Sequence, residues 1–351
     1  MRTAFRSDRY PRLMEDNSVI FRISAPEAKS VRLVIPILGS FPMECDSLGV
    51  WTIRTAPLKE GFHYYWFNID GAEVNDPLVK VYHGYGREAG AIEIPVPDSE
   101  WMEVQDVAHG RVSEVYYFSG VVNKWRKLCV YTPAEYDSKP FKRFPVMYIG
   151  HGSGEDNRGW MEQGRTGIIL DNLIAAGEAT PMIVVSMDSQ LFDELAPYNK
   201  EGMQPYSHEF LEYIVPFVDK TFRTKADAAH RAMCGLSQGS GEAFYIGMTH
   251  PELFSNIGMF SCGLYGKMKQ AGLDFDKEIP GLMSQSEKFN KNFKVIYFSC
   301  GIQDYRIDDY DALTQELRDC GLEFVYERLE GYHEWQPWRE SVRNFARLIF
   351  K

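Results

Sequence analysis

The pentapeptide Gly235-Leu-Ser-Gln-Gly239 is the sequence feature that most narrows the choice of fold. It follows a short apolar run, Ala232–Cys234, which predicts a buried strand, and it precedes the helix-like segment Glu242–Met248. A serine with glycine two residues before and two residues after it, between a strand and a helix, is typical of a tight turn that projects the hydroxyl above a sheet. The glycines permit a close approach of strand and helix that a side chain would prevent.

This turn makes Ser237 a candidate nucleophile, and two possible partners follow it in the chain. Asp304 lies just beyond the apolar run Val295–Phe298, and His333 lies beyond the run Phe324–Leu329. In such an arrangement the serine attacks an acyl carbon, the histidine takes its proton, and the aspartate holds the imidazole. A turn serine, a helix-capping aspartate and a loop histidine are the ordinary interpretations of each residue alone. Their joint order Ser, Asp, His favours catalysis.

A second glycine-rich turn supplies a candidate oxyanion hole. The apolar run Pro145–Ile149 leads into His151-Gly-Ser-Gly154, as expected for the loop that donates one N–H to an oxyanion. The other donor is the N–H of Gln238, the residue after the candidate nucleophile. The first donor is the N–H of either Gly152 or Ser153. We expect His151 to shape the loop, because His333 already fills the role of base.

From about residue 108 onward, strand-like runs alternate with helical segments. Alternation of this kind predicts a mostly parallel sheet covered by helices on both faces. With the serine turn, it predicts an α/β-hydrolase fold. The predicted strands are Val112–Phe118, Leu128–Thr132, Pro145–Ile149, Met182–Met187, Ala232–Cys234, Ile257–Phe260, Val295–Phe298 and Phe324–Leu329, and the predicted helices are Gly167–Ala176, Glu209–Phe222, Asp308–Cys320 and Trp338–Phe350.

The N-terminal part of the chain has a different pattern. Short alternating runs between Pro, Gly and Asp turns, such as Val19–Ser24 and Val31–Ile35, predict an all-β sandwich of the Ig-like kind. We therefore expect a β-sandwich over residues 1–95, a linker over residues 96–107 and the α/β-hydrolase domain over residues 108–351.

Composition limits the partners. A net charge of -11 argues against nucleic acid and anionic membranes, and no apolar run approaches the length of a membrane span. The N-terminus shows no signal peptide, although a signal removed earlier would leave the same picture.

None of the six cysteines or eight histidines shows metal-ligand spacing, so we expect no metal and no cofactor. Cys262 and Cys300 each end a strand-like run, and a disulfide between them is one possibility.

Residues 108–351 resemble the putative esterase family, which includes esterase D, enterochelin esterase and the feruloyl and acetyl xylan esterases. The segment Gly331-Tyr-His-Glu-Trp335 is closest to the feruloyl and acetyl xylan branch. The resemblance implies that Ser237, Asp304 and His333 are the nucleophile, acid and base. The sequence has Gln238-Gly-Ser240 where the family commonly has Met-Gly-Gly, which leaves the acyl preference open. The other matching segments are Val130–Tyr136, Tyr148–Gly152, Leu170–Ile174, Pro181–Val185, Arg231–Ser237 and Cys300–Asp304.

The N-terminal region resembles the Ig-like, starch-binding-type module that often precedes such esterases. The matching stretches are Phe21–Val31, Gly49–Trp51 and Gly71–Pro77. The resemblance implies a module related to carbohydrate-binding modules. Four aromatic residues could stack on sugar rings or could instead fill the sandwich core. They are Trp51, Tyr64, Tyr65 and Trp66.

These features predict a serine carboxylic-ester hydrolase, with feruloyl esters of plant hemicellulose (xylan) as the first choice of substrate. Acetyl xylan esters are an alternative, as are siderophore or thioester substrates, and a non-catalytic carbohydrate-binding protein is disfavoured by the intact Ser, Asp, His set. An aromatic acyl group needs an apolar slot, for which the candidates are Trp160, Tyr305, Tyr332 and Trp335; each could equally be core packing. The resemblance implies a secreted or periplasmic protein, a cytoplasmic location is left open, and the oligomeric state is unknown.

Overall fold

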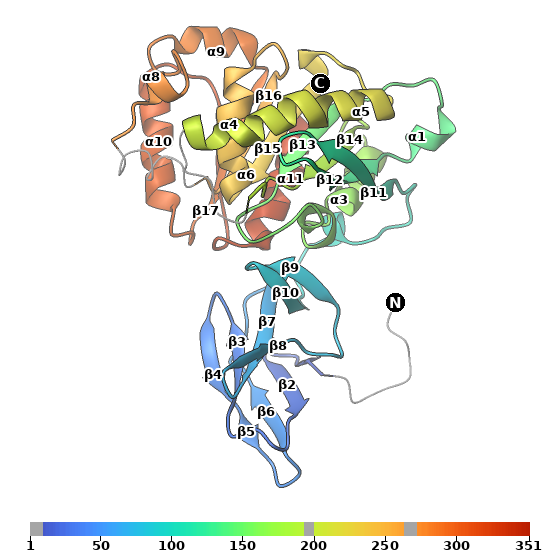
Figure 1. Ribbon diagram of the computed structural model, residues 1–351, viewed down its shortest axis with the longest axis vertical. Coiled ribbons are helices and arrows are strands. Elements are labelled where there is room, and N and C mark those ends of the chain that lie inside the picture. The colour runs from blue at the N-terminus through green and yellow to red at the C-terminus, as the bar shows by residue number, and fades with distance from the viewer. Residues whose placement is uncertain (1–9, 193–199, 263–271) are drawn as a thin grey trace. The chain divides into compact units, whose positions relative to one another are not determined.

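The computed structural model describes residues 10–192, 200–262 and 272–351. The chain divides into two compact units, Met1–Ser99 and Glu100–Lys351. Figure 1 shows the all-β first unit and the helix-rich second unit.

The first unit is built from two antiparallel sheets. One has the strand order β1-β2-β6-β5, and the other has the order β4-β3-β7-β10-β9 with β8 paired to β7. Alternate residues of β3, Val31, Leu33 and Ile35, are buried, as the period-2 pattern predicts. The strands are β1 (Arg12–Leu13), β2 (Val19–Ser24), β3 (Val31–Ile35), β4 (Gly39–Pro42), β5 (Glu44–Cys45), β6 (Val50–Arg54), β7 (Gly61–Ile69), β8 (Ala72–Val74), β9 (Val81–Gly84) and β10 (Arg87–Ile94).

The aromatic residues of this unit pack mainly against one another. Trp51 and Tyr65 belong to the buried core between the sheets, with Phe21 and Phe67. On β7, the rings of Tyr64 and Trp66 lie 5.5 and 6.3 Å from the ring of Tyr85. Of the two interpretations that the sequence left open, core packing therefore describes Trp51 and Tyr65.

The second unit contains an eight-stranded sheet of order β11-β12-β14-β13-β15-β16-β17-β18. From β14 to β18 the neighbours are parallel, while β11 and β12 form an antiparallel hairpin at one edge. Every residue of β13, β14 and β15 is buried, as expected for strands covered on both faces. The strands are β11 (Arg111–Ser119), β12 (Lys124–Thr132), β13 (Val146–Gly150), β14 (Ile183–Met187), β15 (Arg231–Leu236), β16 (Asn256–Phe260), β17 (Val295–Gly301) and β18 (Val325–Leu329).

Helices cover both faces of this sheet, with α4, α5 and α6 on one face and α3 and α11 on the other (Figure 1). This is the α/β-hydrolase fold that the sequence predicts. The short helices between residues 275 and 292 are additional to the prediction. The helices are η1 (Glu100–Met102), α1 (Glu135–Ser138), α2 (Gly159–Glu162), α3 (Thr166–Ala175), α4 (Lys200–Glu209), η2 (Phe210–Ile214), α5 (Val215–Thr221), η3 (Ala228–His230), α6 (Ser237–Glu242), η4 (Ala243–Gly247), α8 (Phe275–Glu278), α9 (Ser286–Asn292), α10 (Ile307–Asp319) and α11 (Trp335–Leu348).

Residues 100–107, which the sequence analysis assigns to a linker, make contacts within the second unit. Met102 is 1% exposed, and the Asn172 side-chain amide donates to the carbonyl groups of Trp101 and Glu103 at 3.0 and 2.9 Å. Asp171 on α3 also accepts a hydrogen bond from the N–H of Gly110 at 2.8 Å. The end of this segment is thus held by α3, a contact that local composition does not reveal.

Candidate active site

The turn at Ser237 has a strained backbone. Strand β15 ends at Leu236, helix α6 begins at Ser237, and the φ of Ser237 is 51°, in the left-handed region. Non-glycine residues in this region cost free energy and concentrate at functional sites. The helix N-terminus that follows adds backbone N–H groups and a partial positive charge beside the hydroxyl.

Glycine is required on both sides of Ser237 because three backbone segments touch there. A Cβ on Gly239 would lie 2.4 Å from the carbonyl carbon of Gly150, and one on Gly235 would lie 2.5 Å from that of Gly239. The N–H of Gly239 donates to the carbonyl of His151 at 2.9 Å. The strand, the helix and the loop after β13 are therefore packed backbone to backbone, which is the physical content of the sequence motif.

The other two candidate catalytic side chains are hydrogen-bonded to each other. His333 Nδ1 donates to Asp304 Oδ2 at 2.7 Å. This bond directs the other ring nitrogen, Nε2, away from the aspartate. Burial acts to raise the pKa of Asp304, but the hydrogen bond and charge of His333, with donors from Arg306 and Ser261, hold that pKa below its ordinary value. Asp304 is thus a carboxylate that orients the imidazole and can stabilise its protonated form.

The loop carrying His333 is tied to the end of β17. Gly331 has a φ of 125°, and a Cβ on Gly301 would lie 2.3 Å from the carbonyl oxygen of Gly331. Gln303 holds Gly331 twice, through its own N–H at 3.1 Å and through its side-chain oxygen at 2.6 Å. These contacts fix the position of the imidazole relative to Asp304, which lies one residue beyond Gln303.

Two aromatic rings flank the imidazole of His333. The ring of Trp338 on α11 lies 5.0 Å away and perpendicular to it, and that of Tyr305 lies 5.1 Å away. The indole N–H of Trp338 donates to Ser261 Oγ at 3.1 Å. Ser261 also has a left-handed φ, 50°, at the end of β16. Sequence reasoning missed Ser261, and no local signal marks it.

The sheet brings the three candidate catalytic residues to one edge. Ser237 follows β15, Asp304 follows β17 and His333 follows β18, and these strands are parallel within one sheet. The carboxyl ends of parallel strands meet at the edge where ligands of open α/β sheets bind. The geometry therefore supports one site that contains all three residues.

The structure distinguishes between the two candidate donors of the loop after β13. The N–H of Gly152 already donates to Glu155 Oε2 at 3.1 Å, which leaves the N–H of Ser153 as the candidate donor. The N–H of Gln238 lies in the first turn of α6, where backbone donors have no acceptor within the helix. The hydroxyl of Ser153 donates to the side-chain oxygen of Gln238 at 2.8 Å, so these two residues touch.

A buried polar network lies behind these donors. His151 donates through Nδ1 to the carbonyl of Gly152 at 2.7 Å and through Nε2 to Asp188 at 3.2 Å. Burial lowers the pKa of His151, but the bond and charge of Asp188 outweigh it and raise the pKa to about 9. His151 is thus an imidazolium that holds the loop, consistent with the role expected from the sequence.

Glu242 is the second ionisable group of this network. It is 1% exposed, and burial raises its pKa to about 7. Its Oε1 accepts from the side-chain amide of Gln238 at 3.2 Å, and its Oε2 has no partner within the described residues. The sequence analysis did not select Glu242, although one acidic residue within an apolar helical segment was an available signal.

The four predicted slot residues fall into two groups. Trp160 and Trp335 are 0% and 1% exposed, with ring centroids 5.4 Å apart, and the indole N–H of Trp160 donates to the carbonyl of Gly150 at 2.7 Å. They are core side chains that support the loop after β13. Tyr305 and Tyr332 are 75% and 38% exposed and flank His333 in sequence or space, so they remain candidates for substrate contact.

Other sequence expectations concern the cysteines, metals and membranes. Cys262 and Cys300 are not joined, so the structure does not contain the disulfide that the sequence left possible. The described residues contain no cluster of three or more metal-binding side chains. No helix in the described ranges has the length and hydropathy needed to span a bilayer.

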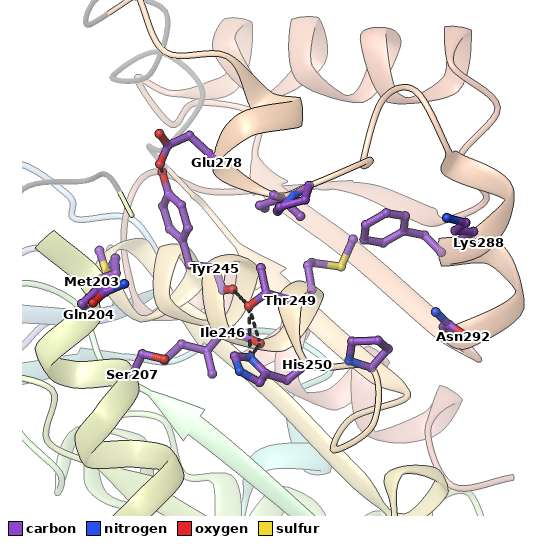
Figure 2. A pocket seen from close by; sticks show the side chains of 15 residues that line it. Met203, Gln204, Ser207, Tyr245, Ile246, Thr249, His250, Glu278, Lys288 and Asn292 are labelled. Carbon is purple, nitrogen blue, oxygen red and sulfur yellow. Dashed lines mark hydrogen bonds between the residues drawn. The ribbon is translucent and has the colours of Figure 1, made fainter. Parts of the chain in front are cut away.

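A separate pocket of about 540 Å³ lies among α4, η4, α8 and α9 (Figure 2). Several of its polar groups bond within the protein. The hydroxyl of Tyr245 donates to Glu278 at 3.0 Å, and His250 Nδ1 lies 3.0 Å from the carbonyl of Ile246. None of the candidate catalytic or oxyanion residues lines this pocket. It is therefore distinct from the site at the sheet edge.

Comparison with known proteins gives a family and several relatives. The sequence model described as "Putative esterase" matches residues 119–345. A protein of Xylanibacter ruminicola named endo-1,4-beta-xylanase/feruloyl esterase is 33% identical over 352 residues, which cover 97% of this chain. The match spans only 46% of that relative's length, so this chain corresponds to less than half of it.

Solved structures show the same fold. A ferulic acid esterase aligns with a TM-score of 0.58 and 25% identity, over 69% of this chain and 99% of its own. The ferulic acid esterase of Anaeromyces mucronatus, solved with ferulic acid, aligns with a TM-score of 0.61 and 24% identity, over 73% and 96% of the two chains. The enterobactin esterase of Shigella flexneri aligns over 94% of this chain and 92% of its own, with a TM-score of 0.68 and 17% identity.

Proposed function

Because this chain belongs to the putative esterase family and is a carboxylic ester hydrolase, we propose that it releases feruloyl groups from plant xylan by a serine, acyl-enzyme mechanism. The observation that carries the proposed mechanism is the 2.7 Å bond from His333 to Asp304, on the sheet edge that also bears the strained Ser237. The proposed substrate is supported by the similarity to the xylanase/feruloyl esterase of Xylanibacter ruminicola.

In the first half of the proposed reaction, Ser237 Oγ attacks the ester carbonyl carbon and His333 Nε2 takes the hydroxyl proton. Asp304 stabilises the resulting imidazolium. The carbonyl oxygen becomes an oxyanion that accepts hydrogen bonds from the N–H groups of Ser153 and Gln238. When the C–O bond to the sugar breaks, the imidazolium gives its proton to the departing sugar oxygen, and the acyl group remains on Ser237.

In the second half, water replaces the sugar. His333 takes one proton from the water as its oxygen attacks the acyl carbon, and the same oxyanion forms. Collapse of this intermediate breaks the bond to Ser237, which recovers its proton from His333, and the free acid leaves. Each N–H donor of an oxyanion hole is typically worth roughly 3 kcal/mol in the transition state.

The exposed ring of Tyr305 gives the proposed acyl slot one wall. It lies beside the imidazole of His333, and the guanidinium of Arg306 lies 5.2 Å from its centre. An aromatic acyl group placed next to His333 can pack against this ring. Tyr332, on the other side of His333 in the sequence, is the second candidate wall.

The proposal is tested with a feruloylated and acetylated arabinoxylan, by measuring ferulate and acetate release together. We expect ferulate release by the parent and none by Ser237→Ala. Acetate alone would replace the proposed acyl group with acetyl. Turnover of a simple aryl acetate with neither product would reject the xylan substrate but keep the serine mechanism, whereas full activity of Ser237→Ala would reject that mechanism.

A further inference from the structure

Gln238 occupies the position after the candidate nucleophile, and both the oxygen and the nitrogen of its side-chain amide are hydrogen-bonded. We propose that the Ser153 and Gln238 side chains form a cross-link that fixes the two oxyanion N–H donors relative to each other. The proposal rests on the proposed serine mechanism, in which these residues supply the two donors. Gln238 thereby acts twice, as a donor through its backbone and as a positioning residue through its side chain.

The contacts favour one orientation of the Gln238 amide. Its oxygen accepts from Ser153 Oγ at 2.8 Å, while its nitrogen donates to Glu242 Oε1 at 3.2 Å and points toward Ser189 Oγ at 3.4 Å. The reverse orientation would place the NH₂ group away from the buried carboxyl of Glu242. Gln238 is 7% exposed, so water has little access to compete for these bonds.

Ser153 needs such a connection because of where it lies. It is exposed, and the next residue, Gly154, has a φ of 78° and no side chain that could anchor this part of the turn. The bonds from His151 and Glu155 hold the carbonyl and N–H of Gly152, one residue earlier. The hydroxyl bond to Gln238 is what links Ser153 itself to α6.

The other end of the cross-link is anchored in the protein interior. Glu242 is one turn along the same helix from Gln238 and almost fully buried. Its Oε2 has no hydrogen-bond partner within the described residues. Burying a carboxyl group costs free energy unless the group is hydrogen-bonded, and here the carboxyl of Glu242 accepts a hydrogen bond from the amide of Gln238. The chain of contacts therefore runs from Glu242 through Gln238 to Ser153.

The cross-link makes a kinetic prediction. We expect Gln238→Leu and Ser153→Ala each to lower kcat on an aryl acetate by about 10-fold, less than the loss of a whole donor, because both N–H groups remain but are held less well. KM should change little. Affinity for an aryl trifluoromethyl ketone, whose carbonyl becomes an oxyanion on Ser237, should fall by the same factor as kcat/KM.

A double-mutant cycle separates the cross-link from two unrelated effects. If the side chains act through each other, the double variant should be no slower than the slower single variant. Ser186→Ala is the matched control, since it removes a buried hydroxyl from β14 that has no partner within the described residues. The proposal would be overturned if the fold-losses in kcat of the two single variants multiplied in the double variant. It would also be overturned if a lower Tm alone explained the losses in kcat.

Amide hydrogen exchange tests the same proposal without catalysis. Gln238→Leu should speed exchange at the N–H of Gly152, which is hydrogen-bonded to Glu155, while Ser186→Ala should not. Unchanged exchange in Gln238→Leu would overturn the cross-link even if the enzyme were slower. Full esterase activity of Ser237→Ala would instead reject the serine mechanism and leave the exchange result to decide whether the side chains hold the loop.

Discussion

Gly239→Ala tests whether the contact between α6 and β13 sets the active-site geometry. The added Cβ would lie 2.4 Å from the carbonyl carbon of Gly150 and 2.6 Å from its oxygen. Non-bonded carbon atoms prefer about 3.5–4.0 Å, so the two backbones must separate by roughly 1 Å. The backbone of Gly150 belongs to a fully buried strand and cannot move aside as a flexible side chain would.

That displacement has two measurable consequences. A misplacement of about 1 Å at an active site can cost on the order of 100-fold in rate, so we expect kcat on an aryl acetate to fall by about that factor. Overpacking costs about 1–3 kcal/mol. For a unit of this size each kcal/mol lowers Tm by roughly 2–4 °C, so Tm should fall by roughly 2–12 °C.

The control is Gly159→Ala, whose Cβ would meet the ring of Trp335 at 3.4 Å, an ordinary contact distance. We expect this variant to keep the kcat and Tm of the parent. The reasoning would be refuted if Gly239→Ala also kept both, or if the two variants lost the same activity, because the loss would then not depend on backbone overlap.

Further predictions concern charge and domain boundaries. Asp304→Asn should lower kcat by about 10³–10⁴-fold, because the amide cannot hold the same imidazole tautomer, with initial rates as the check. Because the pKa of Asp304 is lowered in the folded protein, its carboxylate stabilises the fold above the ordinary aspartate range, and this stabilisation is lost as pH falls through the lowered pKa. The Tm of the parent should therefore fall more than that of Asp304→Asn between neutral and acid pH. Glu242 has the opposite sign: its pKa is raised to about 7, so the parent loses stability as pH rises toward that value, and the Tm of Glu242→Gln relative to the parent should increase over the same range. A chain of residues 100–351 should unfold at a higher temperature than residues 108–351, because the shorter chain lacks the buried Met102; equal melting temperatures would argue against a structural role for this segment.

Much of the fold could be predicted from the sequence because it depends on local patterns. Fully apolar runs such as those around Tyr148 and Val185 need cover on both faces, and their alternation with helices leaves few topologies besides a parallel sheet. The position of an Asp or a His after a strand end likewise follows from chain order. The G-x-S-x-G motif predicted the tight turn at Ser237 because its glycines are needed where the strand and the helix come into close contact.

Other features depend on contacts between distant segments. Trp160 and Trp335 have the composition of an aromatic slot, but the packing of α2 against α11 buries them against each other. An aromatic side chain is equally hydrophobic in a binding site and in a protein core, so only the surrounding structure shows which of the two it occupies. For the same reason, the positions of Cys262 and Cys300 at strand ends could not show whether the two cysteines form a disulfide.

The sequence by itself therefore determined the α/β-hydrolase sheet and the order of Ser237, Asp304 and His333, because strand periodicity and glycine-dependent turns are properties of short segments. The tertiary structure alone decided that the N–H of Gly152 is bonded to Glu155 and that the hydroxyl of Ser153 meets Gln238. Hydrogen bonds between residues far apart in the chain depend on how β13, β15 and α6 pack together, and no short segment carries that information.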